Sequence, residues 1–175
     1  MQHVMIDLET YGTEAGCVLR SIGAVFFDPN HGTFGDEFYR NFTHEDQISR
    51  GAFIDPETQK WWDKQSSSAQ EILWIDQKPF YQSMLEFDQF FKRFKGKFVW
   101  SQGSNFDGVL LEHSLKMFDL KVPWRFFNSR DTRTAYQMSG LDTKSIFRKG
   151  TYHNALDDAK HQARCVIAAY ERIYK

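Results

Sequence analysis

The chain opens with His3-Val4-Met5-Ile6-Asp7-Leu8-Glu9-Thr10, an apolar run that ends in two carboxylates. On a β-strand, side chains alternate between faces, so Asp7 and Glu9 point the same way and Leu8 points the other way. Two like charges on one face of a buried strand repel each other and are costly to desolvate. A divalent cation between them removes that cost, and carboxylate oxygens suit Mg²⁺ or Mn²⁺. The alternative is a pair of ordinary surface acids on an edge strand.

The composition indicates one folded domain over residues 1–175. Aromatic residues make up 17% of the chain and charged residues 26%, and the formal net charge is -1. Without a global basic field, a nucleic-acid partner would be met by a local patch or by metal ions. No apolar run approaches the ~20 residues that span a membrane, and no signal segment opens the chain. Cys17 and Cys165 lack a CxxC partner, so we expect free thiols and a cytoplasmic protein.

The order of the patterns predicts an α/β fold with a mixed five-stranded sheet and helices on both faces. Three strands come first as an antiparallel meander, and helices then alternate with two further strands. The expected strands are residues 3–10, 18–27, 34–42, 97–101 and 125–128. The expected helices begin at Pro56, Ser68, Pro79, Asn105, Thr132 and Asn154, with Ser68 and Asn105 as capping residues.

Further acids follow the fourth strand and open the last helix. Asp107 falls in the first turn after Asn105, where the helix dipole alone would favour an acid. If the fourth strand lies beside the first, Asp107 arrives near Asp7, at the strand ends where ligands gather in α/β sheets. Asp157 and Asp158 both lie off the centre of the apolar stripe of the last helix, and periodicity favours Asp158 only weakly. His153 precedes that helix and is a candidate base if carboxylates surround it.

These residues resemble the three sequence motifs of the DEDDh 3'–5' exonucleases. The matching segments are Asp7-Leu8-Glu9-Thr10, Asn105-Phe106-Asp107, and His153 with four residues before Asp158. A finer resemblance, in Asp55-Pro56-Glu57-Thr58 and Trp61-Trp62, is to small phage and bacterial exodeoxyribonuclease VIII-like proteins and to mycobacterial exoribonuclease-like proteins. Gln102 and Gly103 stand where many relatives carry His-Asn, but the carboxylate of the second motif is kept.

The resemblance implies a ribonuclease H-like three-layer fold and a metal-dependent 3'–5' exonuclease that releases nucleoside 5'-monophosphates. It implies two divalent cations, Mg²⁺ or Mn²⁺, with Asp7 between them. Glu9 and Asp158 would complete the site of one cation, and Asp107 would serve the other. His153 would deprotonate the attacking water. The expected partner is the 3' end of single-stranded DNA or RNA, and relatives are often homodimers.

Several neighbours of these residues are expected to contact the substrate. Thr10 and Tyr11 would meet the terminal nucleotide, although ordinary packing explains Tyr11 equally well. Trp61 and Trp62 are adjacent and cannot share one helix face, so one is core, and we assign Trp62 to the substrate.

Basic residues flank the histidine: Arg130, Arg133, Lys144, Arg148 and Lys149. Of these, Arg148 and Lys149 are assigned to phosphate contacts, although charge runs are usually solvated surface. His113 and His161 are expected to be ordinary helix residues, since neither has a metal-ligand partner at useful spacing.

Two other functions remain open from the sequence. One is a nucleic-acid-binding module that has lost catalysis, which the complete set of five catalytic residues argues against. The other is a hydrolase of short oligonucleotides or of a dinucleotide. DNA and RNA are not separated, because that choice rests on contacts to the 2'-hydroxyl group.

Overall fold

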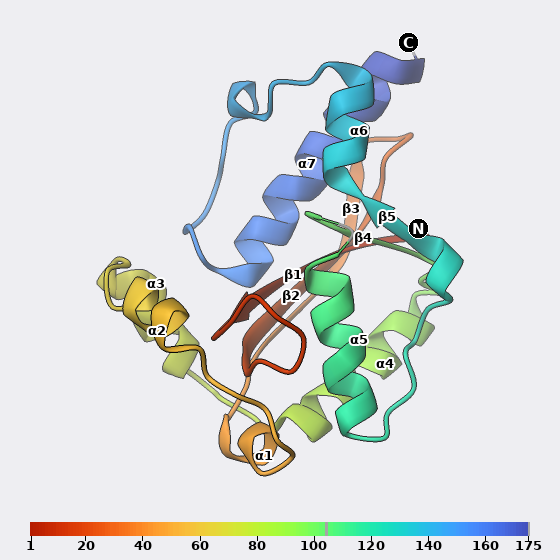
Figure 1. Ribbon diagram of the computed structural model, residues 1–175. Coiled ribbons are helices and arrows are strands. Elements are labelled where there is room, and N and C mark those ends of the chain that lie inside the picture. Colours follow the sequence, from red (N-terminus) through yellow and green to blue (C-terminus); the bar gives the residue numbers. More distant parts are fainter. Residues whose placement is uncertain (104, 175) are drawn as a thin grey trace.

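Within the residues that the structure describes, 1–103 and 105–174, five strands form a mixed sheet in the order β3–β2–β1–β4–β5 (Figure 1). The structure is a computed structural model. β1 pairs with β2 in antiparallel and with β4 in parallel orientation; β2–β3 is antiparallel and β4–β5 parallel. The strands are β1 (His3–Thr10), β2 (Leu19–Asp28), β3 (Thr33–Asn41), β4 (Phe98–Ser101) and β5 (Ser129–Asp131). The predicted mixed sheet with its antiparallel meander is confirmed.

Helices cover both faces of this sheet, with α4 and α5 on one side and α6 and α7 on the other (Figure 1). The alternation along β1 divides the core, because Ile6 packs with Phe87 of α4 while Met5 packs with Ala163 of α7. The helices are α1 (Glu45–Ile48), α2 (Pro56–Trp62), α3 (Ser67–Glu71), α4 (Phe80–Arg93), α5 (Asp107–Met117), α6 (Thr132–Ser139) and α7 (Ala155–Tyr174). Short 3-10 turns are η1 (Ile72–Trp74), η2 (Phe126–Asn128) and η3 (Thr143–Ser145).

Three local predictions were wrong. Ser66, not Ser68, caps α3, since its hydroxyl oxygen accepts from the Ala69 N–H at 3.3 Å. Asn105 does not cap α5, which begins at Asp107 with Phe106 at the capping position and no side-chain hydrogen bond. The strand predicted over residues 125–128 is replaced by Arg125 and the turn η2 over 126–128, and β5 follows them. The turn is closed by a 2.8 Å hydrogen bond from the Asn128 N–H to the Arg125 carbonyl oxygen.

A glycine in β2 lets the last helix approach the sheet closely. A Cβ atom at Gly23 would lie 2.2 Å from the carbonyl carbon of Ala155 and from the nitrogen of Leu156. Any larger residue would therefore push the first turn of α7 away from β2. This contact fixes the height at which Asp157 and Asp158 stand above the sheet.

The two cysteines agree with the expectation from composition. Cys17 and Cys165 are both buried free thiols, as predicted. Within residues 1–103 and 105–174, none of the helices has the length and apolar character needed to cross a membrane.

Candidate active site

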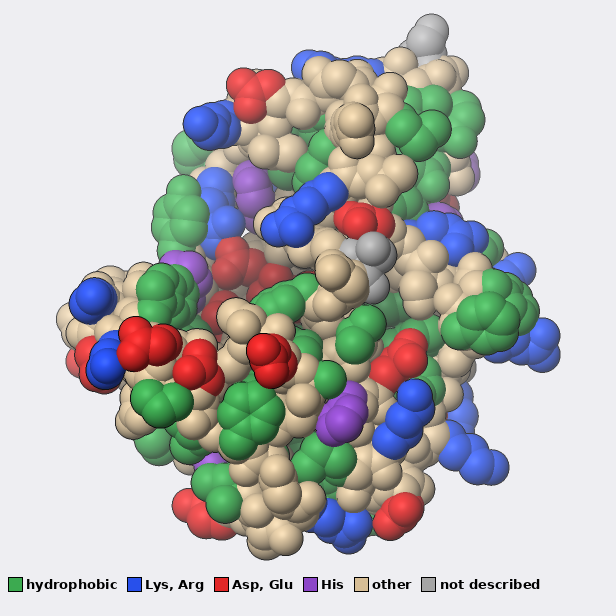
Figure 2. Space-filling model, viewed as in Figure 1, with side chains coloured by type: hydrophobic (Ala, Val, Ile, Leu, Met, Phe, Trp, Pro, Cys, Tyr) green, Lys and Arg blue, Asp and Glu red, His purple; other side chains and the backbone are tan. Residues whose placement is uncertain are grey.

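The four predicted carboxylates and His153 line one cleft of about 350 Å³ at the carboxyl ends of β1 and β4. Figure 2 shows acidic side chains recessed in a hollow in the middle of this face, with Arg and His side chains beside them. The lining residues are Asp7, Leu8, Glu9, Gln102, Phe106, Asp107, Arg133, Arg148, Tyr152, His153, Asp158, His161 and Gln162. The structure thus brings together residues that are far apart in the sequence: Asp7 and Asp158 are separated by 151 positions.

β1 supplies the first two carboxylates on its α7 side. Asp7 Oδ1 accepts a hydrogen bond of 2.6 Å from Gln162 Nε2, one helical turn beyond Asp158 on α7. Glu9 is buried two residues further along the same face. The strand therefore places both acids under the beginning of α7, as the alternation predicts.

Asp107 arrives from the other side of β1. β4 runs parallel to β1, and the chain leaves it through Gly103, whose φ of +118° suits glycine. Asp107 is buried in the first turn of α5 and accepts a hydrogen bond of 3.2 Å from the Leu8 N–H. This bond joins the second motif directly to the strand that carries the first.

The structure distinguishes the two adjacent acids of α7. Asp157 accepts a 2.8 Å hydrogen bond from the Thr151 N–H, and its carboxylate packs against Gly150, so it holds the preceding loop. Asp158 faces the cleft and accepts a 3.0 Å bond from the His153 N–H. The buried Asn154 caps the helix, because its Oδ1 accepts from the Leu156 and Asp157 N–H groups.

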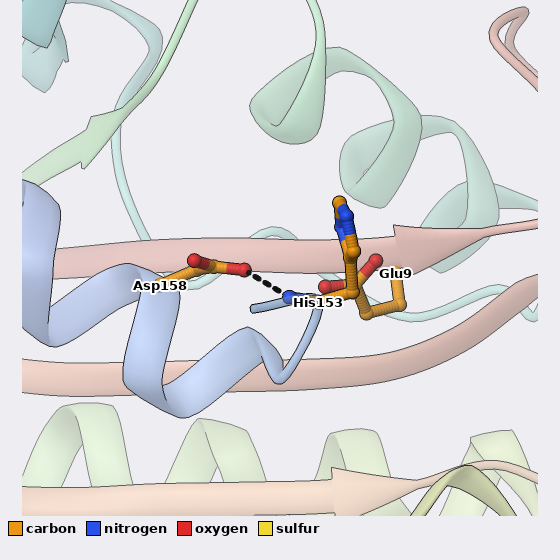
Figure 3. A group of neighbouring side chains, drawn as sticks. All are labelled: Glu9, His153 and Asp158. Atoms are coloured by element: carbon orange, nitrogen blue, oxygen red, sulfur yellow. Dashed lines mark hydrogen bonds between the residues drawn. The ribbon is translucent and has the colours of Figure 1, made fainter. Parts of the chain in front are cut away.

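His153 stands at the rim of the carboxylates on a left-handed backbone with φ of +61°. Ligand atoms of Glu9, His153 and Asp158 all lie within 4.8 Å of one another (Figure 3). The imidazole packs edge-on against Trp61 and Trp62, with ring centroids 4.9 Å and 5.9 Å away. Its orientation is therefore set by the tryptophans as well as by its backbone bond to Asp158.

The cleft concentrates negative charge in a poorly hydrated place. Burial, with repulsion from Asp158 and Asp107, raises the pKa of Glu9 to about 8. Burial likewise raises the pKa of Asp107 to about 7. Burial and the charges of Asp107, Glu9 and Asp158 raise the pKa of Asp7 well above its ordinary value. A set of oxygen donors held together against this repulsion fits divalent cations, whose charge would offset it.

Arg148 occupies part of the cleft as an internal cation. Its guanidinium forms an ion pair with Asp158, and both side chains are largely buried. The same guanidinium lies 3.9 Å from the ring centroid of Tyr152. Lys149, next to it, is exposed. Arg133 also lines the cleft, but Arg130 lies elsewhere, over Phe98 at the amino end of β4.

The residues expected to contact the nucleoside differ in how far they are exposed. Trp62 is 3% exposed and donates its indole N–H to the Thr10 carbonyl oxygen at 2.8 Å, so it belongs to the core, whereas Trp61 is 43% exposed. Tyr11 is also buried. Both rings enclose the Arg20 guanidinium, which lies 4.3 Å from the Tyr11 centroid and 4.4 Å from that of Trp62. Thr10 is buried and donates its hydroxyl to the Gly12 carbonyl oxygen.

A second hollow of about 490 Å³ adjoins the carboxylates. Its walls include Leu8, Glu9, Trp61, Trp62 and Phe106, and it is mainly apolar. Because Glu9, Leu8 and Phe106 line both hollows, a ligand can extend from one into the other. The second hollow is therefore continuous with the candidate chemical centre.

Sequence reasoning missed two cleft residues on α7. His161, expected to be an ordinary helix residue, lines the cleft, and Gln162 bonds Asp7. Both follow Asp158 by three or four positions, so helical periodicity was the signal that could have found them. Phe106 and Arg133 required the tertiary arrangement.

Comparisons with known proteins agree with this architecture. A family model described as the 3'-5' exoribonuclease Rv2179c-like domain matches residues 2–170. The nuclease domain of 3'hExo, a DEDDh family member bound to rAMP, is similar with a TM-score of 0.62 at 14% identity, over 95% of this chain and 90% of that one. The zinc-bound complex of E. coli ExoI with ssDNA has a TM-score of 0.64 at 11% identity, over 93% of this chain and 39% of that one.

Exonuclease X in complex with 5' overhanging duplex DNA has a TM-score of 0.52 at 14% identity, over 97% of this chain and 92% of that one. At such identities the solved structures show the fold, and the expected ribonuclease H-like fold is confirmed. A search among curated proteins found no match. The family model covers nearly the whole chain, so this chain belongs to the family of 3'-5' exoribonuclease Rv2179c-like domains and is a 3'-5' exonuclease.

Proposed function

We propose that this exonuclease hydrolyses the 3'-terminal phosphodiester of single-stranded nucleic acid or of a 3' overhang and releases nucleoside 5'-monophosphates. The observation that carries the proposal is the convergence of Asp7, Glu9, Asp107 and Asp158 with His153 on one open cleft. A phosphodiester end can enter such a cleft only if cations offset the carboxylates. Membership of an exoribonuclease-like family favours RNA, while the similar structures include a nuclease domain bound to rAMP and a complex with ssDNA.

The carboxylates are the proposed holders of two divalent cations. Asp7 shares β1 with Glu9 and interacts electrostatically with Asp107 and Asp158 as well, so it can serve both cations, with Glu9 and Asp158 on one side and Asp107 on the other. When bound, the cations supply Lewis acidity and offset the charge of the phosphate. Gln162 orients Asp7, and the Leu8 N–H orients Asp107, through the hydrogen bonds described above.

His153 is the proposed general base. Its ring lies at the mouth of the cleft beside Glu9 and Asp158, where an attacking water would approach the phosphorus. An imidazole can accept the proton of that water at neutral pH and release it to solvent afterwards. Trp61 limits the rotation of the ring, which keeps the accepting nitrogen directed toward the cleft.

The adjoining apolar hollow is the proposed seat of the terminal nucleoside. Trp61 and Phe106 offer aromatic surface at its walls, and base–aromatic stacking tolerates every base. Trp62 is mostly buried but also lines the hollow, so it stays a proposed contact beside Trp61 and Phe106, whereas Tyr11 is not among the lining residues. Thr10 still lines the hollow and remains a candidate contact.

Arg148 and Lys149 are the proposed phosphate contacts next to the histidine. Arg148 is paired with Asp158 and stacked on Tyr152, so it can exchange the carboxylate for a phosphate oxygen without leaving the cleft. Lys149 is exposed on the same loop and would act as a point charge.

Labelled substrates test the proposal. Single-stranded RNA and DNA of equal sequence, labelled at the 3' or the 5' end, are incubated with Mg²⁺ or Mn²⁺. We expect stepwise loss from the 3' end, nucleoside 5'-monophosphate products, and no reaction in EDTA. The faster polymer identifies the substrate class, and a length series separates a nuclease from a hydrolase of short oligonucleotides.

The Asp7→Asn variant is the matched control, because it keeps the shape of the side chain and removes one charge. It should bind nucleic acid and leave it intact. Metal-dependent binding of both polymers without cleavage by the native chain would contradict the proposal and favour the inactive binding module.

A further inference from the structure

Two adjacent phenylalanines lie largely in solvent, far from the carboxylates in the fold. Phe126 is 83% exposed and Phe127 is 55% exposed, both on η2 directly before β5. Their rings are nearly perpendicular, with centroids 5.3 Å apart. Apolar surface of this size in water is unfavourable, and a pair of exposed rings therefore indicates a binding surface.

Cationic side chains alternate with these rings. The Arg125 guanidinium lies 5.8 Å from the Phe127 centroid. The Arg130 guanidinium lies 4.7 Å from the Phe98 centroid, and Lys97 Nζ lies 5.0 Å from the same centroid. We call this surface the η2 patch and define it as Lys97, Phe98, Arg125, Phe126, Phe127 and Arg130.

The backbone beneath the η2 patch is held in place. Arg130 Nη1 donates to the Phe127 carbonyl oxygen at 3.0 Å and to the Ser129 carbonyl oxygen at 2.9 Å. Trp124 Nε1 donates to Glu112 Oε1 at 3.0 Å and anchors the preceding loop to α5. A cavity of about 400 Å³ opens between Lys97, Trp124 and Phe127. The rings are thus presented by a fixed turn.

The η2 patch lies at the opposite end of β4 from the chemistry. Phe98 is the first residue of β4, and Asp107 follows its last residue. Four strand residues span about 13 Å, so no residue of the patch touches the scissile bond. In the view of Figure 2, hydrophobic side chains flanked by Lys and Arg side chains gather at the right-hand edge, where Figure 1 shows the chain that leads into β5.

We propose that the η2 patch is a second binding site for single-stranded nucleic acid, which holds nucleotides on the 5' side of the end being cleaved. Phe126 and Phe127 stack on bases, while Lys97 and Arg125 contact phosphates. The choice of a nucleic-acid strand as the ligand of the patch rests on the proposed function. A second copy of this chain fits less well, because a symmetric contact would bring the same cations face to face.

Binding in EDTA isolates the patch, since the carboxylate cleft without cations repels phosphate. The probe is a fluorescent 30-nucleotide single strand, as RNA and as DNA. The variants are Phe126→Ala/Phe127→Ala, Phe126→Leu/Phe127→Leu and Lys97→Glu/Arg125→Glu. The charge control is Arg50→Glu/Lys92→Glu, which reverses two exposed ion-paired cations elsewhere.

Both phenylalanine variants should bind roughly tenfold or more weakly, because leucine keeps apolar surface but cannot stack. The Lys97→Glu/Arg125→Glu variant should bind more weakly than the charge control. Its plot of the logarithm of the binding constant against the logarithm of the salt concentration should be less steep by about 1.4. Unchanged affinity of the Phe126→Ala/Phe127→Ala variant would overturn the proposal. A second result would also overturn it: light scattering shows a dimer for the native chain and for the leucine variant, but a monomer for the alanine variant.

Hydrolysis of a four-nucleotide substrate with Mn²⁺ separates this proposal from the proposed function. Such a substrate occupies the cleft without needing the η2 patch, so every patch variant should cleave it at the native rate. Loss of this activity in the patch variants would overturn the second site. Failure of the native chain to cleave it would instead contradict the proposed function and leave the EDTA binding result to decide on the patch.

Discussion

The carboxylate cleft gathers buried acids, whereas the η2 patch exposes aromatic rings among cationic side chains. In the cleft, burial and mutual repulsion raise the pKa of Glu9 to about 8. At the patch, Phe126 keeps 83% of its surface in water. Bound cations would offset the repulsion between the carboxylates of the cleft. Stacked bases would cover the exposed rings of the patch. On both proposals, one substrate occupies the two regions, with chemistry at one end of β4 and affinity at the other.

Changing a cleft ligand should have the largest effect, on substrates of every length. Asp158→Asn removes a carboxylate from the proposed cation site, and several kcal/mol of lost stabilisation corresponds to a fall in kcat on the order of 10³-fold. Asp157→Asn keeps an oxygen for the Thr151 N–H and should change kcat by less than about tenfold. Steady-state hydrolysis of the four- and thirty-nucleotide substrates checks both. Equal losses in the two variants would break the assignment of Asp158 as the cleft acid.

The His153→Gln variant should come next. Loss of a general base lowers kcat by about 10²–10⁴-fold and removes the rise of the rate with pH that the base produces. The pH profile of kcat is the measurement, with Trp61→Phe as a control that keeps an aromatic contact to the imidazole. A variant profile parallel to the native one would show that His153 only packs in the cleft.

Gln162→Leu tests the support of Asp7 and should have a smaller effect. Removing its 2.6 Å hydrogen bond frees the Asp7 carboxylate, and second-sphere changes of this kind cost about 10–100-fold in metal affinity. Mn²⁺ titration by calorimetry measures the change. Gln162→Glu sharpens the result, because an added carboxylate beside Asp7 should raise repulsion in EDTA. Native Mn²⁺ affinity in Gln162→Leu would remove this residue from the site.

The smallest effect concerns stability. Burial raises the pKa of Asp107 in the folded state to about 7. Between about pH 4 and pH 7 the folded state therefore binds more protons than the unfolded state. The free energy of unfolding consequently falls as the pH rises through this window. In EDTA at pH 8, Asp107→Asn should be more stable by on the order of 2 kcal/mol, or about 4–8 °C in Tm.

Near pH 4 that difference should vanish, and saturating Mg²⁺ should favour the native chain by mass action. Thermal melts at the two pH values, with and without Mg²⁺, give the four comparisons. A native chain that is the more stable one in EDTA at pH 8 would contradict the repulsion in the cleft.

Local patterns sufficed for the strand and the acids that organise the site. An apolar strand followed by Asp7 and Glu9, and an acid in the first turn of α5, are features that alternation and capping describe. Asp157 and Asp158 could not be separated by periodicity, because their difference lies in what the loop at Gly150 and Thr151 offers each carboxylate.

Local patterns were insufficient where distant elements decide the outcome. Trp62 and Tyr11 are buried because they enclose Arg20 of β2, a contact that no local pattern contains. Phe126 and Phe127 favour a strand by propensity, yet β4 is short and on the side away from β1 it pairs with Ser129–Asp131, so the phenylalanines turn outward. This error concealed the η2 patch.

Mn²⁺ binding to the native chain and to Asp7→Asn, followed by calorimetry at pH 7 in two buffers of different ionisation enthalpy, tests the central claim most directly. The account predicts saturable binding to the native chain, up to two ions, with release of protons from carboxyl groups whose pKa is raised. Asp7→Asn should lose most of this binding. Absence of Mn²⁺ binding in the native chain, or equal binding without proton release in both, would contradict the assignment of the cleft as a divalent-cation site.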